Sequence, residues 1–373
     1  DYYASRGLGD VYKRQVLMST ISLCMIVKDE EKVIERCLNT IVDIVDEIII
    51  VDTGSQDSTK EKVKKYKADI YDFPWKDDFA EARNFAFSKA RMDYILWLDA
   101  DDVLEKEDQE KLKLLKENLN NTVDVISMMY VLSTDENNNP VVSLRRNRIV
   151  KRKNNYIWIG KVHEYLEVYG NILSVDIAVR HLKDKEYTDR NLKIFRKMAL
   201  ENQEFSPRDL FYYGNELYDN EYYFEAIKSY EDFIATEKGW IEDIKQALIK
   251  ISECYGFIGY KDKEEEYLFK GLQYDIPSSD LCCRIGYIFY EKEKYEIAAF
   301  WYENAINNSP KPGSLSLVNS CMYTWVPALQ LCVCYCKIGD FNKANEYNEL
   351  AARYVPSHSS VINNRKYLLN KVK

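Results

Sequence analysis

The stretch YILWLDADDVLEKED, residues 94–108, decides the fold of the first half of this chain. Its first five residues are apolar, which is typical of a buried strand, and the strand is followed by Asp99, Asp101 and Asp102. Asp99 and Asp101 lie two residues apart, so on an extended chain their carboxylates point the same way and repel each other unless a cation lies between them. Two interpretations follow: the group holds a divalent metal ion, or Asp101 and Asp102 cap the helix that comes next.

Apolar strands alternate with helical segments on the N-terminal side of this stretch. The runs ISLCMIV (residues 21–27) and EIIIVD (residues 47–52) are almost entirely apolar, and a segment with helical spacing separates them. This pattern predicts a parallel sheet covered by helices on both faces. In such sheets ligands bind beyond the carboxyl ends of the strands, which is where Asp29, Asp52 and Asp99 collect.

The C-terminal half repeats itself. After Tyr187 the periodicity is helical throughout, and two segments align with Gly214 on Gly286 and Ala226 on Ala298. The alanines are two periods of about 36 residues apart, close to the ~34-residue tetratricopeptide unit. This part therefore resembles tetratricopeptide repeats, in which small residues let paired helices pack closely.

These patterns divide the chain into three parts. Residues 1–17 show no periodicity, and we interpret them as a non-native leader. Residues 18–200 are expected to form an α/β domain, with antiparallel strands over residues 122–182. Residues 201–373 are expected to form an all-α repeat domain, interrupted by a Pro/Ser/Gly loop at residues 309–320.

Composition narrows the expected partners. The formal net charge of -9 disfavours binding to nucleic acid, because the chain as a whole repels a phosphate backbone. No apolar run approaches the roughly 18 residues of a transmembrane helix, so we expect a cytoplasmic protein without a transmembrane segment. Nine cysteines without CxxC spacing are interpreted as reduced packing residues.

A basic cluster occupies one predicted hairpin. It consists of Arg145, Arg146, Arg148, Lys151, Arg152 and Lys153. These residues either form a solvated face of the hairpin or attract phosphates or an acidic acceptor, and the sequence leaves both interpretations open.

Four segments in order resemble glycosyltransferase family two, the inverting nucleotide-sugar-dependent enzymes of the GT-A fold. They are ISLCMIVKDEE, EIIIVDTGSQDST, FAEARNFAFSKA and YILWLDADD, all between residues 21 and 102. The resemblance implies a GT-A domain with a mixed sheet, a UDP-sugar donor, and Mn²⁺ or Mg²⁺ bound at an Asp-x-Asp motif. The segments GKVHEYL and AVRHLKDKEYTDRN are similar to parts of family-two enzymes with C-terminal helical repeats, including peptide glycosyltransferases of the bacteriocin S-glycosylating type.

The resemblance also implies roles for individual residues. The nucleotide-sugar would be bound by Val27, Glu31, Asp52, Arg83, Asn84, Asp99 and Ala100. Asp52 would read the uracil edge, Arg83 would lie in the nucleotide pocket, and Asn84 would support that part of the chain. For the stretch around Asp52, a simple strand-to-helix turn capped by Ser55 or Asp57 is the alternative.

The metal and catalytic residues come from the same resemblance. Asp99, Asp101 and His181 are the expected metal ligands, with His181 alternatively contacting the pyrophosphate. Glu164 is the expected general base, and His163 would orient it. The alternative for both histidines is an ordinary strand residue with local hydrogen bonds.

The expected activity is transfer of a sugar from a nucleotide-sugar, with a peptide or protein acceptor bound by the repeats. A surface-glycan or lipid-linked acceptor, and a catalytically degenerate repeat scaffold that only binds partners, are the alternatives. A nucleotidyltransferase is disfavoured because no Gly-rich phosphate-binding loop is present. A homodimer is compatible with the sequence.

Overall fold

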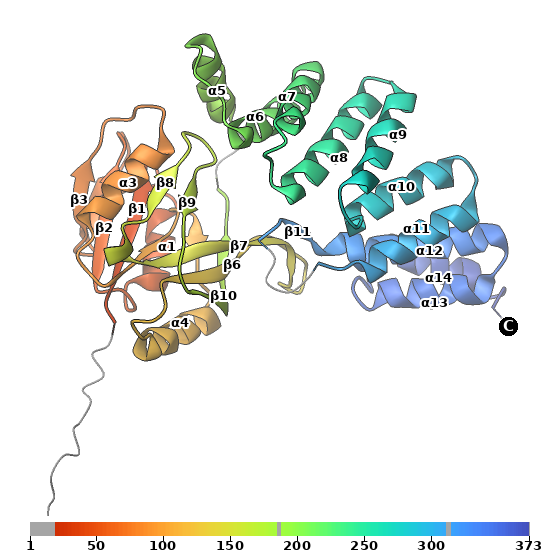
Figure 1. Cartoon of the computed structure of the whole chain (residues 1–373). Helices are drawn as coiled ribbons and strands as arrows, with labels where there is room; N and C mark the ends of the chain where they lie inside the picture. Colours follow the sequence, from red (N-terminus) through yellow and green to blue (C-terminus); the bar gives the residue numbers. More distant parts are fainter. Residues whose placement is uncertain (1–18, 185–187, 311–314, 373) are drawn as a thin grey trace, which may run out of the picture.

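The computed structural model describes residues 19–184, 188–310 and 315–372, and it shows an α/β domain followed by a row of paired helices (Figure 1). The predicted leader at residues 1–17 lies outside the described residues. The predicted fold class, an α/β domain with a mixed sheet followed by a helical repeat domain, is confirmed.

The core of the first domain is a mixed sheet with the strand order β3-β2-β1-β4-β7-β6-β10-β5. Its parallel part comprises β1 (Ile21–Val27), β2 (Glu47–Asp52), β3 (Asp69–Asp72) and β4 (Tyr94–Trp97). Every residue of β2 is buried, as expected of a strand with helices on both sides. The predicted parallel sheet is therefore present in this part.

The second part of the sheet differs from its prediction. Strands β6 (Val125–Thr134) and β7 (Pro140–Lys151) are antiparallel, but β10 (Ile172–His181) pairs with β6 in parallel. The expectation of antiparallel strands throughout residues 122–182 is thus wrong for β10. A parallel neighbour requires a crossover, and here the crossover contains a separate two-stranded sheet.

That crossover contains the turn that carries His163 and Glu164. Two short strands, β8 (Ile157–Ile159) and β9 (Tyr165–Glu167), pair with each other in this crossover. Gly160 and His163 between them have φ of 98° and 52°, left-handed values that end an extended chain.

Helices cover both faces of the sheet. Helices α1 (Ile34–Ile41), α2 (Thr59–Lys64) and α4 (Lys106–Asn118) pack on one face. Helix α3 (Phe79–Lys89) and the β8–β9 pair pack on the other. The edge strand β5 (Asp102–Val103) pairs with the end of β10, so the acidic stretch is built into the sheet.

The second domain consists of consecutive helix pairs after α5 (Arg190–Leu200). The pairs are α6 (Pro207–Asp219) with α7 (Tyr223–Ala235), α8 (Ile241–Phe257) with α9 (Lys261–Lys270), α10 (Ser279–Glu291) with α11 (Tyr295–Asn307), and α12 (Trp325–Ile338) with α13 (Phe341–Ala352), followed by α14 (Ser359–Leu368). Short 3-10 turns lie at η1 (Arg152–Asn154), η2 (Gly271–Gln273) and η3 (Ser320–Tyr323). No helix in the described part of the chain is long and apolar enough to cross a membrane.

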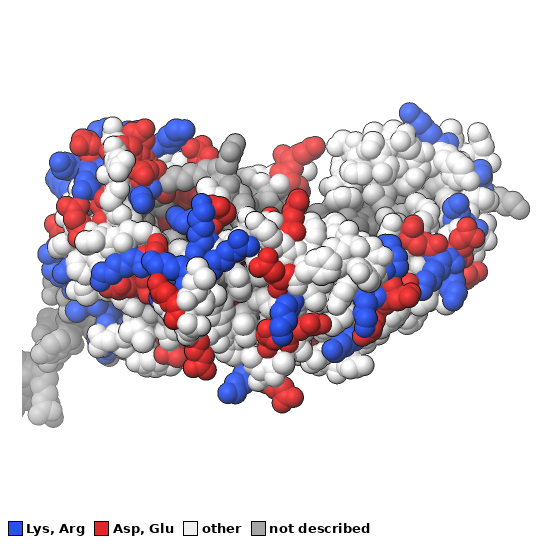
Figure 2. All heavy atoms as spheres, turned by 90° about the horizontal axis from the view of Figure 1, so that it is seen from above, with Lys and Arg blue, Asp and Glu red and all other residues white. Residues whose placement is uncertain are grey.

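The two domains are in contact at several places in the described part of the chain. Helix α5 contributes Ile194, Phe195 and Met198 to a cluster that also contains Trp75 and Phe79 of the first domain. The predicted boundary between residues 200 and 201, at the end of this shared helix, stays a prediction. Basic and acidic side chains are interspersed over the face of both domains seen in Figure 2.

A second contact corrects a prediction. Strand β11 (Val318–Asn319) lies in the segment predicted to be a loop, and it pairs antiparallel with β7. Residues 311–314 of that segment lie outside the described residues. The last helix pair is therefore attached to the sheet of the first domain through backbone hydrogen bonds.

Close helix packing depends on the two aligned glycines. A Cβ built on Gly214 would lie 2.6 Å from the ring of Tyr230, and one on Gly286 would lie 3.0 Å from the ring of Tyr302. Both tyrosines are almost fully buried. The predicted repeat alignment therefore corresponds to equivalent contacts in two helix pairs.

The substitution Gly214→Ala tests this contact. Helix propensity alone would stabilise the protein by about 1 kcal/mol, whereas overpacking against a buried ring costs about 1–3 kcal/mol. We expect a net loss in the free energy of unfolding in urea, and a smaller loss for Gly286→Ala because its contact is longer. Stabilisation by Gly214→Ala would contradict the close approach.

Candidate active site

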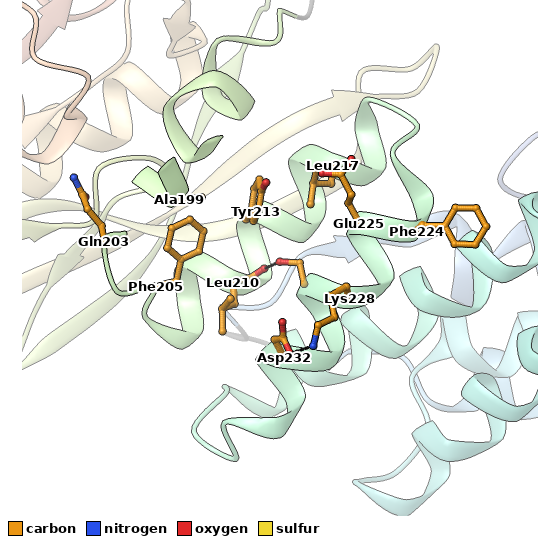
Figure 3. A pocket seen from close by; sticks show the side chains of 11 residues that line it. Ala199, Gln203, Phe205, Leu210, Tyr213, Leu217, Phe224, Glu225, Lys228 and Asp232 are labelled. Carbon is orange, nitrogen blue, oxygen red and sulfur yellow. Dashed lines mark hydrogen bonds and ion pairs between the residues drawn. The ribbon is translucent and has the colours of Figure 1, made fainter. Parts of the chain in front are cut away.

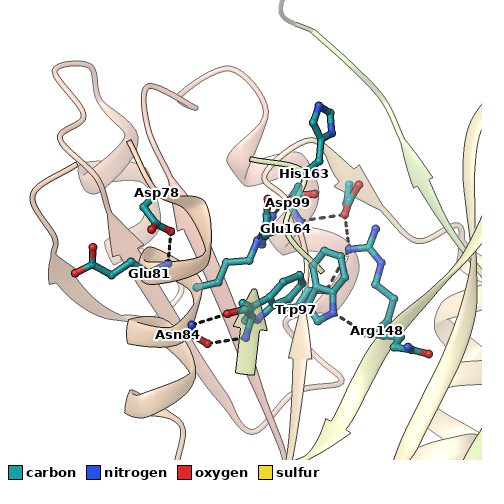
Figure 4. A network of polar contacts seen from close by, with 12 residues as sticks. Asp78, Glu81, Asn84, Trp97, Asp99, Arg148, His163 and Glu164 are labelled. Carbon is teal, nitrogen blue, oxygen red and sulfur yellow. Dashed lines mark hydrogen bonds and ion pairs between the residues drawn. The ribbon is translucent and has the colours of Figure 1, made fainter. Parts of the chain in front are cut away.

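Three distant segments meet at one arginine. Arg83 lies on α3. This helix begins directly after Asp78, whose side chain accepts a capping hydrogen bond from the Glu81 amide (2.8 Å). The Arg83 side chain is buried, its Nη2 donates to Asp99 Oδ1 (2.7 Å), and its Nε donates to Glu164 Oε1 (2.5 Å). Asp99 and Glu164 accordingly lie close together beside Trp97 in Figure 4.

The ionisation of this group follows from its surroundings. Burial alone would raise the pKa of Asp99, but the positive charges of Arg83 and Arg148 outweigh it and hold that pKa below its usual value. Burial lowers the pKa of Arg83, yet Asp99 and Glu164 raise it above its usual range. The rings of Trp97 and Trp158 lie 5.0 and 4.9 Å from the guanidinium and add cation–π contacts. Arg83 is therefore a permanent cation.

A second group of ligand atoms lies beside this one. Asp101, Asp102 and His181 each offer an atom within 4.8 Å of the others. His181 Nδ1 lies 3.3 Å from Asp101 Oδ1 and 3.6 Å from Asp102 Oδ1. Both His181 Nδ1 and Asp102 Oδ1 are buried and have no hydrogen-bond partner among the described residues. Two carboxylates and an imidazole with unsatisfied atoms fit Mn²⁺ or Mg²⁺.

The structure changes the expected membership of this group. Asp102 is completely buried, and α4 begins only at Lys106, so the interpretation of Asp101 and Asp102 as a helix cap is wrong. Asp99, expected beside Asp101 on the metal, is held by Arg83 and lies outside the group. Its role as a metal ligand stays a prediction.

Arg148 is a buried residue that sequence reasoning missed. Its guanidinium lies 4.0 Å from the ring of Trp97 and 4.4 Å from that of Tyr130. Its Nη1 lies 3.0 Å from Asp102 Oδ2, which also accepts from the Asp99 amide. The available signal was the alternation of Arg146 and Arg148 along one strand, which puts both side chains on the same face.

Two neighbouring cavities open on these residues, with volumes of about 190 and 280 Å³. They share the walls formed by Phe79, Arg83, Asp99 and Arg190. The smaller is also lined by Val27, Thr53, Ala100 and Asp101, and the larger by Tyr130, Arg146, Trp158, His163 and Glu164. Arg146 belongs to the basic cluster whose role the sequence left open, and Arg190 was not predicted as a site residue. Arg83 and Asp99 thus form part of the wall between two adjoining cavities.

Asp52 forms the strand-to-helix turn that was its alternative, and its role in reading a uracil edge stays a prediction. Its Oδ1 accepts from the amides of Gly54 (2.9 Å) and Ser55 (2.8 Å), as in a simple turn that uses the left-handed φ of Gly54. Its Oδ2 is buried and lacks a hydrogen-bond partner in the described part of the chain. Asp52 therefore has one acceptor atom left for a ligand.

Two further predicted nucleotide residues have local partners. Glu31 Oε2 accepts from the Ser58 amide (3.1 Å) ahead of α2, while the neighbouring Glu30 lines the smaller cavity. Asn84 exchanges two hydrogen bonds with the backbone of Trp158, at 2.9 and 2.8 Å. Asn84 thus holds α3 against β8, and nucleotide contacts by Glu31 and Asn84 stay predictions.

His163 connects the site to the repeat domain. Its Nε2 lies 2.7 Å from Glu216 Oε1, and its ring stacks on Tyr212 with centroids 4.3 Å apart. The partner of Glu164 is Arg83, so an orienting role of His163 acts only through the turn that carries both residues. The interpretation of His163 as a residue with only local hydrogen bonds is wrong, because Glu216 lies on α6.

Comparison with known proteins agrees with this architecture. Residues 22–177 match the family model described as glycosyl transferase family 2. These residues form a glycosyl transferase family 2 domain. All the site residues described above lie in this domain, except His181 and the residues of helices α5 and α6.

Two curated proteins are similar in sequence to parts of the chain, one over a longer segment and the other at higher identity. It is 30% identical to the SPbeta prophage-derived glycosyltransferase SunS of Bacillus subtilis over 243 residues, which cover 57% of this chain and 54% of SunS. It is 47% identical to a TPR repeat-containing protein of Synechococcus elongatus over 87 residues, which cover 23% of this chain and 22% of that protein. The chain thus spans less than two thirds of either relative. Its structure is also similar to that of S. aureus TarS 1-349 in complex with UDP-GlcNAc, with 14% identity, a TM-score of 0.38, and coverage of 66% of this chain and 90% of that one.

A cavity of about 540 Å³ lies outside the family-two domain, between α5, α6 and α7. Figure 3 shows Phe205, Leu210 and Tyr213 lining it, while Lys228 and Asp232 pair with each other at 2.6 Å. None of the predicted site residues lines this cavity. It is an apolar, aromatic surface of the first helix pair and is separate from the site.

Metal binding to this domain should be coupled to proton release. Asp101 and Asp102 raise the pKa of His181 from 6.5 to about 10, so the metal-free imidazole is protonated at neutral pH. An imidazole must lose its extra proton before it can bind a metal ion, so binding should release about one proton, with apparent affinity rising about tenfold per pH unit below that pKa. Calorimetric titration with Mn²⁺ in buffers of different ionisation enthalpy measures the proton count.

A rise in pH has opposite effects on the stability of the metal-free fold and on metal affinity. In the metal-free protein these ion pairs stabilise the fold fully below pH 6.5 and lose their effect as the pH rises through about 10. His358→Gln, in the repeat domain, should leave the proton count unchanged. Metal binding without proton release would contradict His181 as a ligand.

Proposed function

We propose that this protein is an inverting, divalent-metal-dependent glycosyltransferase that transfers a sugar from a UDP-sugar to an acceptor. One observation carries the proposal: in a family-two domain, the Arg83–Asp99–Glu164 contacts adjoin the group of Asp101, Asp102 and His181. The first group offers a carboxylate base and the second a metal site, and both are needed for inverting transfer.

The smaller cavity is the proposed donor site. Val27, Thr53 and Ala100 line it, and the unsatisfied Oδ2 of Asp52, the residue before Thr53, would accept the N–H of a uracil ring. Asp101, Asp102 and His181 would hold Mn²⁺ or Mg²⁺, which when bound neutralises charge on a departing diphosphate as a Lewis acid.

The larger cavity is the proposed acceptor site. Arg83 holds Oε1 of Glu164, and Oε2 would take the proton from an acceptor hydroxyl or thiol. As that oxygen or sulfur bonds to the anomeric carbon, the bond from this carbon to the diphosphate oxygen breaks, and the configuration inverts. Fixing the base relative to the donor lowers the entropic part of the barrier.

A peptide or protein is the proposed acceptor class. The support is the contact between the repeat helix α6 and the turn that carries Glu164, through His163, Tyr212 and Glu216. Helical repeat arrays bind extended chains on their concave surfaces. A chain bound there would lead toward the larger cavity.

Thermal unfolding with UDP, GDP, CDP and TDP, each with and without Mn²⁺, tests the donor site. A ligand at a hundred times its Kd stabilises the native state by about 2.7 kcal/mol. We expect an increase in Tm with UDP that requires Mn²⁺, and we expect Asp101→Asn to abolish it because one metal ligand is lost.

The matched control is Asp176→Asn, an exposed carboxylate on the strand that ends at His181. It should retain the full shift with UDP and Mn²⁺. Absence of a shift with every nucleotide in the unsubstituted protein would instead favour the degenerate repeat scaffold.

Glu164→Gln tests the general base. The amide still accepts a hydrogen bond from Arg83 but cannot take a proton, so turnover should fall by about 10²–10⁴-fold. The release of UDP from UDP-sugars, with water as acceptor, measures this rate. The exposed Glu167→Gln on β9 is the control, and both variants should bind UDP normally. An unchanged rate in Glu164→Gln would assign the base elsewhere.

A further inference from the structure

The larger cavity contains an arginine without a counter-ion. Arg146 lies on β7 and lines this cavity. Arg146 is half-buried, and its Nε is buried without a hydrogen-bond partner among the residues that the structure describes. Burial lowers the pKa of Arg146, and the neighbouring Arg148 and Arg208 lower it further, while Tyr212 and Tyr130 act in the opposite direction.

The preceding residue, Arg145, shows how an arginine with a structural role is hydrogen-bonded on this strand. The guanidinium of Arg145 donates to the carbonyl of Ser127 (3.2 Å) and twice to that of Val175 (3.1 and 2.9 Å). Adjacent residues of a strand point to opposite faces, so Arg145 and Arg146 have different surroundings. Arg145 is satisfied by the protein, whereas Arg146 faces a cavity.

An unpaired guanidinium at this position is costly. Arginine stays protonated in proteins, so it cannot lose its charge as a buried lysine can. A charge withdrawn from water is destabilising unless an opposite charge compensates it. The carboxylates on the cavity wall, Asp99 and Glu164, are both bound to Arg83. An anionic ligand in the larger cavity would supply the compensating charge for Arg146.

We propose that the acceptor carries an anionic group, a carboxylate or a phosphate, which binds Arg146 in the larger cavity beside Glu164. The planar guanidinium matches either group through paired hydrogen bonds, which fix orientation as well as position. Arg146 is thus a residue for acceptor specificity that places the nucleophile near Glu164. The inference rests on the proposed function, because this cavity is the acceptor site only if the donor occupies the smaller one.

The test uses the full chain saturated with UDP and Mg²⁺, so that the donor site is occupied. Inorganic phosphate and acetate are titrated separately, and binding is measured by calorimetry. We expect at least one anion to bind, about tenfold or more weakly to Arg146→Met, and with intermediate affinity to Arg146→Lys. Tighter binding of phosphate indicates a phosphorylated acceptor, and tighter binding of acetate indicates an acidic side chain.

Arg353→Met, at an exposed position after α13, is the matched control and should bind the anions like the unsubstituted protein. All variants should bind UDP within about twofold of the original affinity, which also shows that they are folded. Equal anion affinity with and without Arg146 would overturn the inference and leave the proposed function standing. A loss of UDP affinity in Arg146→Met would place this residue in the donor site, and failure of the unsubstituted protein to bind UDP would reject the proposed function itself.

Discussion

The site depends on the two hydrogen-bonded ion pairs of Arg83. One guanidinium joins α3, the end of β4 and the turn between β8 and β9, and the Arg83–Glu164 contact spans 81 positions of sequence. Removing one member of a buried pair leaves the other charge uncompensated, which costs several kcal/mol. This constraint places the proposed base at a defined position relative to the acidic stretch. The Phe79 amide, which donates to the Lys161 carbonyl (2.9 Å), holds the same turn at the start of α3.

The acidic stretch is stable because its charges have separate partners. Asp99 faces Arg83, Asp102 faces Arg148 on one oxygen, and Asp101 faces His181. Repulsion between neighbouring carboxylates is thereby reduced before any ligand binds. The protonated His181 occupies the place of a cation in the metal-free protein, which links the metal site to pH.

The repeat domain is part of the site rather than an appendage. Helix α6 contacts His163 through Tyr212, Glu216 and Arg208, whose Nε donates to the His163 carbonyl (3.1 Å). Strand β11 then joins a later part of the repeats to β7, the strand that carries Arg146 and Arg148. These two attachments restrict the orientation of the helices relative to the sheet.

Local features could be predicted from the sequence because they depend on near neighbours. The apolar runs determined the parallel strands, the 72-residue spacing of Ala226 and Ala298 determined the phase of the repeats, and the order of four segments indicated the family. The direction of β10, the pairing of β11, and the partners of Asp99, Asp102 and His163 were decided only by the tertiary structure. These depend on contacts between residues tens to more than a hundred positions apart, where many pairings satisfy the same local periodicity and only packing selects one. Arg146 shows the same limit: its sequence context shows a basic hairpin, but only the folded protein reveals that it lines a cavity with a buried Nε that has no hydrogen-bond partner among the described residues.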